Sequence, residues 1–282
     1  MKFAICNEIF TDWNLHDAMG FAQKTGYQGI EIAPYTIASS VTQISGAERA
    51  QLKKVAERVG IEICGIHWVL VGVEGMYLNH PNTPVQNRTR RYLRDLVDFC
   101  ADIGGKTMVV GSPKQRNVMQ EVSSARAWAI ATDTFRDAVK TAEDRGVTIC
   151  IEPLAPTETN FINTAYEAVE FAQQFKSPAM KIILDVKAMC SEELPINKII
   201  KESAPHFAHF HANDKNLKGP GFGKVDFRPI AAALHEVGYD GYVSVEVFKF
   251  DEGPEVIARK SLDYLHETFG IAKTAAKPKD TE

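Results

Sequence analysis

Residues 124–153 read SARAWAIATDTFRDAVKTAEDRGVTICIEP and contain, in order, a helical pattern, a glycine, an apolar run and a carboxylate. Apolar side chains recur every three to four residues from Ala127 to Phe135 and beyond, which predicts a helix with one buried face. Gly146 follows this pattern and is typical of the residue that ends a helix. The run 147–152 shows little polar alternation, as expected of a strand buried on both faces. This stretch therefore predicts one helix–strand unit of a parallel sheet.

The same unit recurs along the whole chain. Strands are predicted at 3–6, 29–32, 61–66, 107–110, 147–152, 180–184, 207–211 and 242–247, with helical patterns between them. Strict alternation of strand and helix gives a parallel sheet, and eight units are the number that closes a barrel. The alternative, an open doubly wound sheet, normally stops at about five to seven strands. We predict the α/β class, with a single (β/α)8 TIM barrel over residues 1–270 and a disordered tail over 271–282.

Composition and charge narrow the functional classes. The chain has 282 residues, of which 45% are hydrophobic and 24% charged, as in ordinary globular proteins. Its net charge of −4 argues against nucleic acid as a partner. The five cysteines include no C-x-x-C pair, which argues against a disulfide framework or a zinc ribbon. Because we find neither a signal-peptide pattern nor an apolar stretch of about 18 residues, we expect no membrane span and a cytoplasmic location.

Four consecutive predicted strands end in side chains that bind metals. These side chains are Glu152, Asp185, His211 and Glu246. Neighbouring strands lie about 4.8 Å apart, so the four side chains can converge on one cation at the carboxyl end of the barrel. Three carboxylates at one place repel one another unless a divalent ion is present, although each alone could be a surface or salt-bridged residue. The oxygen-rich set favours Mn²⁺, with Mg²⁺, Co²⁺ or Zn²⁺ as alternatives.

Several motifs resemble the xylose-isomerase-like TIM-barrel superfamily. They are IEPL at 151–154, ILD at 183–185, FHAND at 210–214, Val245-Glu246 and the loop GPGFGKVDF at 219–227. Within that superfamily the sequence is most similar to the ketose 3-epimerases, including the stretch EPLAPTETNF at 152–161. The resemblance implies that the four strand-end residues bind the metal, that Glu152 and Glu246 transfer the proton, and that Glu158 contacts the sugar.

The sequence departs from the ketose 3-epimerase pattern at two positions. Ala188 stands where those enzymes place a substrate-binding His, and Leu217 stands where they place an Arg. Lys187, Lys215 and Lys218 are the candidates to replace them. These departures weaken the expectation that the substrate is a simple ketohexose.

Further substrate-binding candidates follow other strands. His67, Trp13, Trp68, Lys114 and Arg116 occupy loops at the predicted carboxyl end of the barrel. The histidine would bind a hydroxyl group, the tryptophans would wall the pocket, and the two cations would meet a carboxylate or phosphate. Each has a plainer alternative, namely packing for the rings and a solvated loop for the cations.

Three more polar residues fall on or beside the predicted strands. Glu8 and Glu31 are either pocket residues or buried ion-pair partners, and His209 faces the barrel interior two residues before His211. We interpret His209 as packing or as support for a metal ligand.

The sequence therefore predicts a metal-dependent isomerase or epimerase of a ketose or related sugar. Proton transfer would pass through a metal-stabilised enediolate. The main alternative is a metal-dependent lyase or dehydratase acting on a keto-sugar, keto-inositol or dehydroshikimate-like substrate. An abasic-site endonuclease or a non-catalytic sugar-binding barrel fits the charge and the strand ends less well. We expect a small sugar or polyol as partner and a homo-oligomer, either a dimer or a tetramer.

Overall fold

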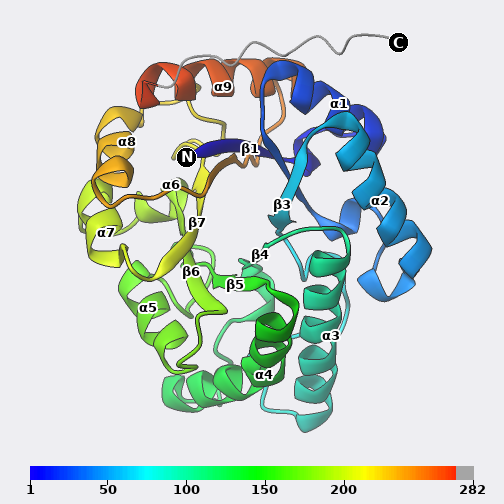
Figure 1. Cartoon of the computed structure of the whole chain (residues 1–282). Coiled ribbons are helices and arrows are strands. Elements are labelled where there is room, and N and C mark those ends of the chain that lie inside the picture. The colour runs from blue at the N-terminus through cyan, green and yellow to red at the C-terminus, as the bar shows by residue number, and fades with distance from the viewer. Residues whose placement is uncertain (271–282) are drawn as a thin grey trace.

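Within the described residues 1–270, eight strands hydrogen-bond in sequence order, and β8 pairs with β1, so the sheet closes (Figure 1). The structure is a computed structural model. The strands are β1 (Lys2–Cys6), β2 (Gly29–Ile32), β3 (Glu62–Ile66), β4 (Thr107–Val110), β5 (Thr148–Ile151), β6 (Met180–Asp185), β7 (Phe207–Ala212) and β8 (Tyr242–Val245). All neighbours are parallel. The predicted (β/α)8 barrel is confirmed, and the open sheet is excluded.

Helices connect the strands and surround the barrel (Figure 1). In the described residues they are α1 (Leu15–Thr25), α2 (Gly46–Val59), α3 (Thr83–Asp102), α4 (Ser124–Arg145), α5 (Ala165–Gln173), α6 (Val186–Met189), α7 (Ile196–Ser203), α8 (Phe227–Glu236) and α9 (Pro254–Phe269). Short 3₁₀ helices lie in loops: η1 (Asn7–Ile9), η2 (Pro34–Thr36), η3 (Val41–Gln43) and η4 (Pro113–Gln115). The sequence pattern does not predict α6, because four residues are too few to show a helical period.

Residues 124–153 form the helix–strand unit that the sequence predicts. α4 buries Ala127 and Phe135, and its first turn is capped by the side chain of Ser123. Gly146 ends the helix with φ +65°, in the left-handed region that favours glycine. β5 then aligns Ile151 with Val110 of β4. The next residue after β5 therefore emerges at the carboxyl end of the barrel.

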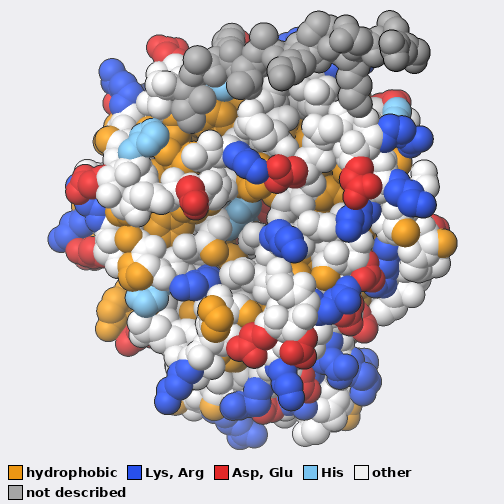
Figure 2. All heavy atoms as spheres, viewed as in Figure 1, with side chains coloured by type: hydrophobic (Ala, Val, Ile, Leu, Met, Phe, Trp, Pro, Cys, Tyr) orange, Lys and Arg blue, Asp and Glu red, His pale blue; other side chains and the backbone are white. Residues whose placement is uncertain are grey.

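The surface and the cysteines agree with an ordinary globular chain. The arginine-rich segment 88–94 lies on α3, where Arg90 forms an ion pair with Asp133 of α4. Figure 2 shows Lys and Arg side chains interspersed with Asp and Glu over one face. All five cysteines are free. None of the helices in residues 1–270 combines the length and the apolar character of a membrane span.

The expected tail lies outside the described residues. The disorder that the sequence predicts for 271–282, and the domain boundary that it sets at residue 270, therefore stay predictions.

Gly65 on β3 lies very close to β4. A Cβ at this position would lie 2.3 Å from the carbonyl oxygen of Thr107, and a backbone atom inside a barrel has little room to move. We expect Gly65→Ala to lower the free energy of unfolding by about 1–3 kcal/mol, the usual cost of overpacking, as measured by urea denaturation.

Gly20→Ala is the matched control. Gly20 lies inside α1, and an added Cβ there meets nothing within 4 Å. This substitution should stabilise the protein by about 0.5–1 kcal/mol, because alanine is the better helix former. Equal unfolding free energies for wild type and Gly65→Ala would contradict the close approach of β3 and β4.

Candidate active site

The four predicted metal ligands meet at the carboxyl end of the barrel. Glu152 follows β5, Asp185 ends β6, His211 lies near the end of β7, and Glu246 follows β8. One ligand atom from each lies within 4.8 Å of those of the others. All four residues are between 0% and 4% exposed. The structure thus brings these side chains together, and their role as metal ligands stays a prediction.

The donor set fits a divalent cation. Nδ1 of His211 is buried without a hydrogen-bond partner among the described residues, and it lies 3.2 Å from Oε2 of Glu246. Burial, together with the charges of Glu246 and Asp185, raises the pKa of Glu152 to about 8. Such crowding of carboxylates is what a bound cation offsets. Three carboxylates and one imidazole are ligands of the kind that Mn²⁺ and Mg²⁺ accept.

Glu31 of β2 contacts Nε2 of His211, the ring nitrogen that points away from the cluster. Its Oε2 lies 3.1 Å from Nε2 of His211 and 2.8 Å from Nε2 of His209. Burial alone raises the pKa of Glu31, but the two histidines outweigh it and lower this pKa well below its usual range. A carboxylate behind an imidazole fixes which ring nitrogen faces a metal. Of the two options left by the sequence, Glu31 is therefore the buried ion-pair partner, and His209 supports it.

Asn213 orients two of the carboxylates. Its Nδ2 donates to Oδ2 of Asp185 at 2.5 Å and to Oε2 of Glu246 at 3.3 Å. The other oxygen of Asp185 accepts a hydrogen bond from the N–H of Ala188 at 2.7 Å and so caps α6. Asn213 belongs to the motif FHAND at 210–214, but its role is not evident from the motif itself. The two-residue period from His211 is the signal that could have found it, because alternate strand residues share a face.

A cavity of about 390 Å³ opens beside the cluster. Its lining includes Glu152 and Glu246 together with Trp68, Lys114, Glu158, Lys187 and Phe248. Nζ of Lys187 lies 2.8 Å from Oε1 of Glu158 and 4.3 Å from the ring centre of Phe248. Three of the predicted substrate-binding residues, Trp68, Lys114 and Glu158, thus border the cavity. Phe248 was missed, because no polar group marks it in the sequence.

The structure does not place His67 or Trp13 in this lining. His67 is fully buried, and its Nε2 lies 2.8 Å from Oε2 of Glu8, which makes Glu8 a buried ion-pair partner. Trp13 packs against the rings of Phe10 and Phe21. Trp13 therefore fits the plainer alternative of packing, whereas His67 is engaged by Glu8. A loop position does not by itself fix the direction of a side chain.

Arg116 also differs from its expected place. It is 0% exposed, and its Nη2 donates to the backbone carbonyl of Glu152 at 2.6 Å. Burial lowers its pKa to about 10, while the charges of Glu152 and Glu158 act in the opposite direction. The guanidinium therefore lies behind the cavity, where it ties the end of β5 to the loop after β4.

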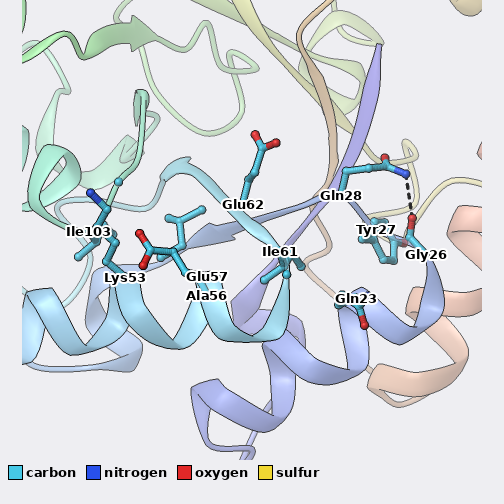
Figure 3. Close-up of a pocket in the computed structure, with 13 residues that line it drawn as sticks. Gln23, Gly26, Tyr27, Gln28, Lys53, Ala56, Glu57, Ile61, Glu62 and Ile103 are labelled. Atoms are coloured by element: carbon cyan, nitrogen blue, oxygen red, sulfur yellow. Dashed lines mark hydrogen bonds between the residues drawn. The ribbon is translucent and has the colours of Figure 1, made fainter. Parts of the chain in front are cut away.

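A larger cavity, about 520 Å³, lies at the amino end of the barrel, between the loops that lead into β2, β3 and β4 (Figure 3). Two of its polar side chains, Gln28 and Glu62, already have partners within the fold. Nε2 of Gln28 donates to the carbonyl of Gly26 at 3.0 Å, and Glu62 pairs with Lys2 at 2.8 Å. In TIM barrels the carboxyl end carries the function and the amino end serves stability. The smaller cavity is therefore the candidate active site.

The family model of the xylose isomerase-like TIM barrel matches residues 19–268. The chain belongs to this family. It is 28% identical to the D-psicose 3-epimerase of Ruminiclostridium cellulolyticum over 227 residues, which are 80% of this chain and 75% of that protein.

Solved structures show the same fold. A D-psicose 3-epimerase crystallised in the presence of D-fructose matches with a TM-score of 0.83 at 22% identity, over 96% of this chain and 100% of that chain. The IOLI protein with a binding zinc atom matches with a TM-score of 0.77 at 17% identity, over 96% and 98% of the two chains. At these identities the structural matches support the shared barrel alone.

We expect the purified protein to hold one divalent ion per chain, because the clustered carboxylates need a cation to balance their charge. Elemental analysis after dialysis measures this content, and EDTA should lower the melting temperature, since an ion that binds only the folded state stabilises it.

Asp185→Asn should lose most of the metal. Glu158→Gln is the matched control, because it removes a carboxylate that lines the neighbouring cavity and does not belong to the cluster. Equal metal contents in the wild type and Asp185→Asn would refute the assignment of the site.

Proposed function

We propose that this chain is a divalent-metal-dependent sugar epimerase that inverts a carbon next to the carbonyl of a ketose. The observation that carries the proposal is that Glu152 and Glu246 belong to the metal-competent cluster and also line the cavity. Relatives named D-psicose 3-epimerase and L-ribulose 3-epimerase support it. Because the named relatives are epimerases, the lyase alternative is not favoured.

A divalent cation held by the four clustered residues would polarise the substrate carbonyl and the neighbouring hydroxyl, which acidifies the C–H bond between them. Glu152 and Glu246 come from β5 and β8, the two outer strands of the four that supply the cluster. From these positions one carboxylate removes the proton from one face of the substrate carbon, and the other delivers a proton to the opposite face. Inversion at that carbon is the result.

Glu158 and Lys187 are the proposed contacts to the sugar hydroxyls. The carboxylate accepts a hydrogen bond from one hydroxyl, and the ammonium donates one to another. Of the three candidate lysines, Lys187 lines the cavity, whereas Lys215 and Lys218 are not among its lining residues and Lys218 pairs with Glu252. Lys187 is therefore the best replacement for the polar group missing at Ala188.

The rings of Trp68 and Phe248 offer the apolar wall that the C–H face of a sugar needs.

Three finer expectations from the sequence stay predictions. They are Mn²⁺ as the resident metal, a homo-oligomeric state and a cytoplasmic location. The hard donor set supports the first, and the measurements on the metal site above test it directly.

Turnover in D₂O should place deuterium on the carbon next to the carbonyl. Glu152→Gln and Glu246→Gln should each lower kcat by about 10²–10⁴, the usual contribution of a positioned acid or base, because the amide keeps the size but lacks the basicity. NMR of the product measures the deuterium, and steady-state kinetics measure kcat. Turnover without deuterium, or near-normal rates in both variants, would contradict the mechanism. A deuterated product that has also lost water would replace it with the lyase.

Glu158→Gln and Lys187→Met should raise KM or lower kcat while the metal content stays full. A hydrogen bond to a charged group contributes about 1.5–3 kcal/mol, which corresponds to roughly 10- to 100-fold in kcat/KM. Lys218→Met is the control and should leave the kinetics unchanged, because Lys218 does not line the cavity. Loss of metal in Glu158→Gln would place this residue in the metal site instead.

A further inference from the structure

Trp68 makes a direct contact with one of the two glutamates. Its indole Nε1 donates a hydrogen bond to Oε1 of Glu246 at 2.7 Å. Glu246 is 1% exposed, so water does not compete freely for this oxygen. The other oxygen, Oε2, lies 3.2 Å from Nδ1 of His211 and accepts from Nδ2 of Asn213 at 3.3 Å. The indole therefore engages one oxygen of the carboxylate while the other faces the cluster.

The second glutamate has no such support. Among residues 1–270 no donor forms a hydrogen bond with the Glu152 carboxylate, although Arg116 binds its backbone carbonyl. The carboxylate lies instead against Gly111, where a Cβ would fall 1.6 Å from its Oε2. Glu152 and Glu246 therefore share the cluster and the cavity but differ in what holds them.

The indole itself is held firmly. Trp68 has φ +51°, in the left-handed region that non-glycine residues adopt only where their surroundings enforce it. Its ring stacks on Tyr35 at 5.9 Å and 23° and on Phe248 at 5.8 Å and 26°. Tyr35 belongs to η2 and Phe248 follows β8, so the ring bridges two separate loops. A side chain fixed in this way holds its N–H donor in one direction.

We propose that Trp68 is the positioning residue of Glu246: its indole N–H fixes one carboxylate oxygen and aims the other at the metal-competent cluster. The side chain of Trp68 thus both lines the cavity and supports the carboxylate of Glu246. The proposal deepens the proposed function and rests on it for the kinetic consequence, which is that proton transfer by Glu246 depends on Trp68 and proton transfer by Glu152 does not. Its consequence for metal binding is independent of catalysis.

The first test is calorimetric titration of metal-stripped protein with Mn²⁺. Trp68→Phe keeps an aromatic ring and the same Cβ, so the backbone demand is unchanged, but it removes the N–H donor. We expect the Kd for Mn²⁺ to rise about 10- to 100-fold, the usual effect of losing a partner of a metal ligand. Trp128→Phe on α4 is the matched control, because it makes the same change in a ring that packs against Phe161 and Phe171 and lies outside the cluster and the cavity lining, and its Kd should change by less than about threefold. A Kd for Trp68→Phe within threefold of wild type, in protein with a normal circular dichroism spectrum, would overturn the proposal.

The second test separates positioning from general damage. Primary deuterium isotope effects on kcat/KM are measured in both reaction directions, with each epimer of a ketose deuterated at the reacting carbon. Trp68→Phe should raise the isotope effect in the direction in which Glu246 removes the proton, and not in the other, because only that step becomes slower. Equal changes in both directions would indicate mere damage to the site and overturn the positioning role.

The two tests also separate this proposal from the proposed function. If the wild type shows no epimerase activity on any ketose but Trp68→Phe weakens Mn²⁺ binding, the proposed function fails and the positioning of Glu246 stands. If the wild type epimerises and neither measurement moves in the variant, the positioning fails alone.

Discussion

A buried carboxylate inside the barrel is the constraint on which the active site depends. Glu31 is 0% exposed, and a charge in that position is tolerated only with partners that replace its water. It finds them in His209 and His211, both on β7 and therefore three strands away from β2 around the barrel. The contact joins two walls of the barrel through its interior. The contact also orients the ring of His211, so that its Nδ1 faces the carboxylate of Glu246 in the cluster.

The fold was predictable because its signals are periodic and local. The helix–glycine–strand unit of 124–153 repeats, and each repeat carries its own pattern of apolar side chains and its own terminating glycine. The positions of Glu152, Asp185, His211 and Glu246 followed from the same logic, since the ends of parallel strands meet at one edge of the sheet. By contrast, α6 was not predictable from periodicity, because it depends on one side-chain cap at Asp185.

Residues on loops were harder to predict for a physical reason. A loop position fixes where a Cα lies but not where its side chain points, so Arg116 and Lys114, two residues apart, end in different surroundings: one lies behind the cavity and the other lines it. Contacts between side chains far apart in the chain are equally invisible in a single sequence. The hydrogen bond from Trp68 to Glu246 spans 178 residues, and nothing in either local motif indicates it.

The cap on α6 joins two parts of the site that otherwise look separate. Asp185 gives one oxygen to the N–H of Ala188 and the other to the side that faces the cluster. Lys187, the second residue of the helix that this cap begins, reaches the cavity and pairs with Glu158. Asp185, the proposed metal ligand, therefore also fixes the backbone that positions the ammonium group of Lys187 for the sugar. The proposed metal ligand and the proposed sugar contact therefore share one short piece of backbone, so a change at Asp185 would reach both.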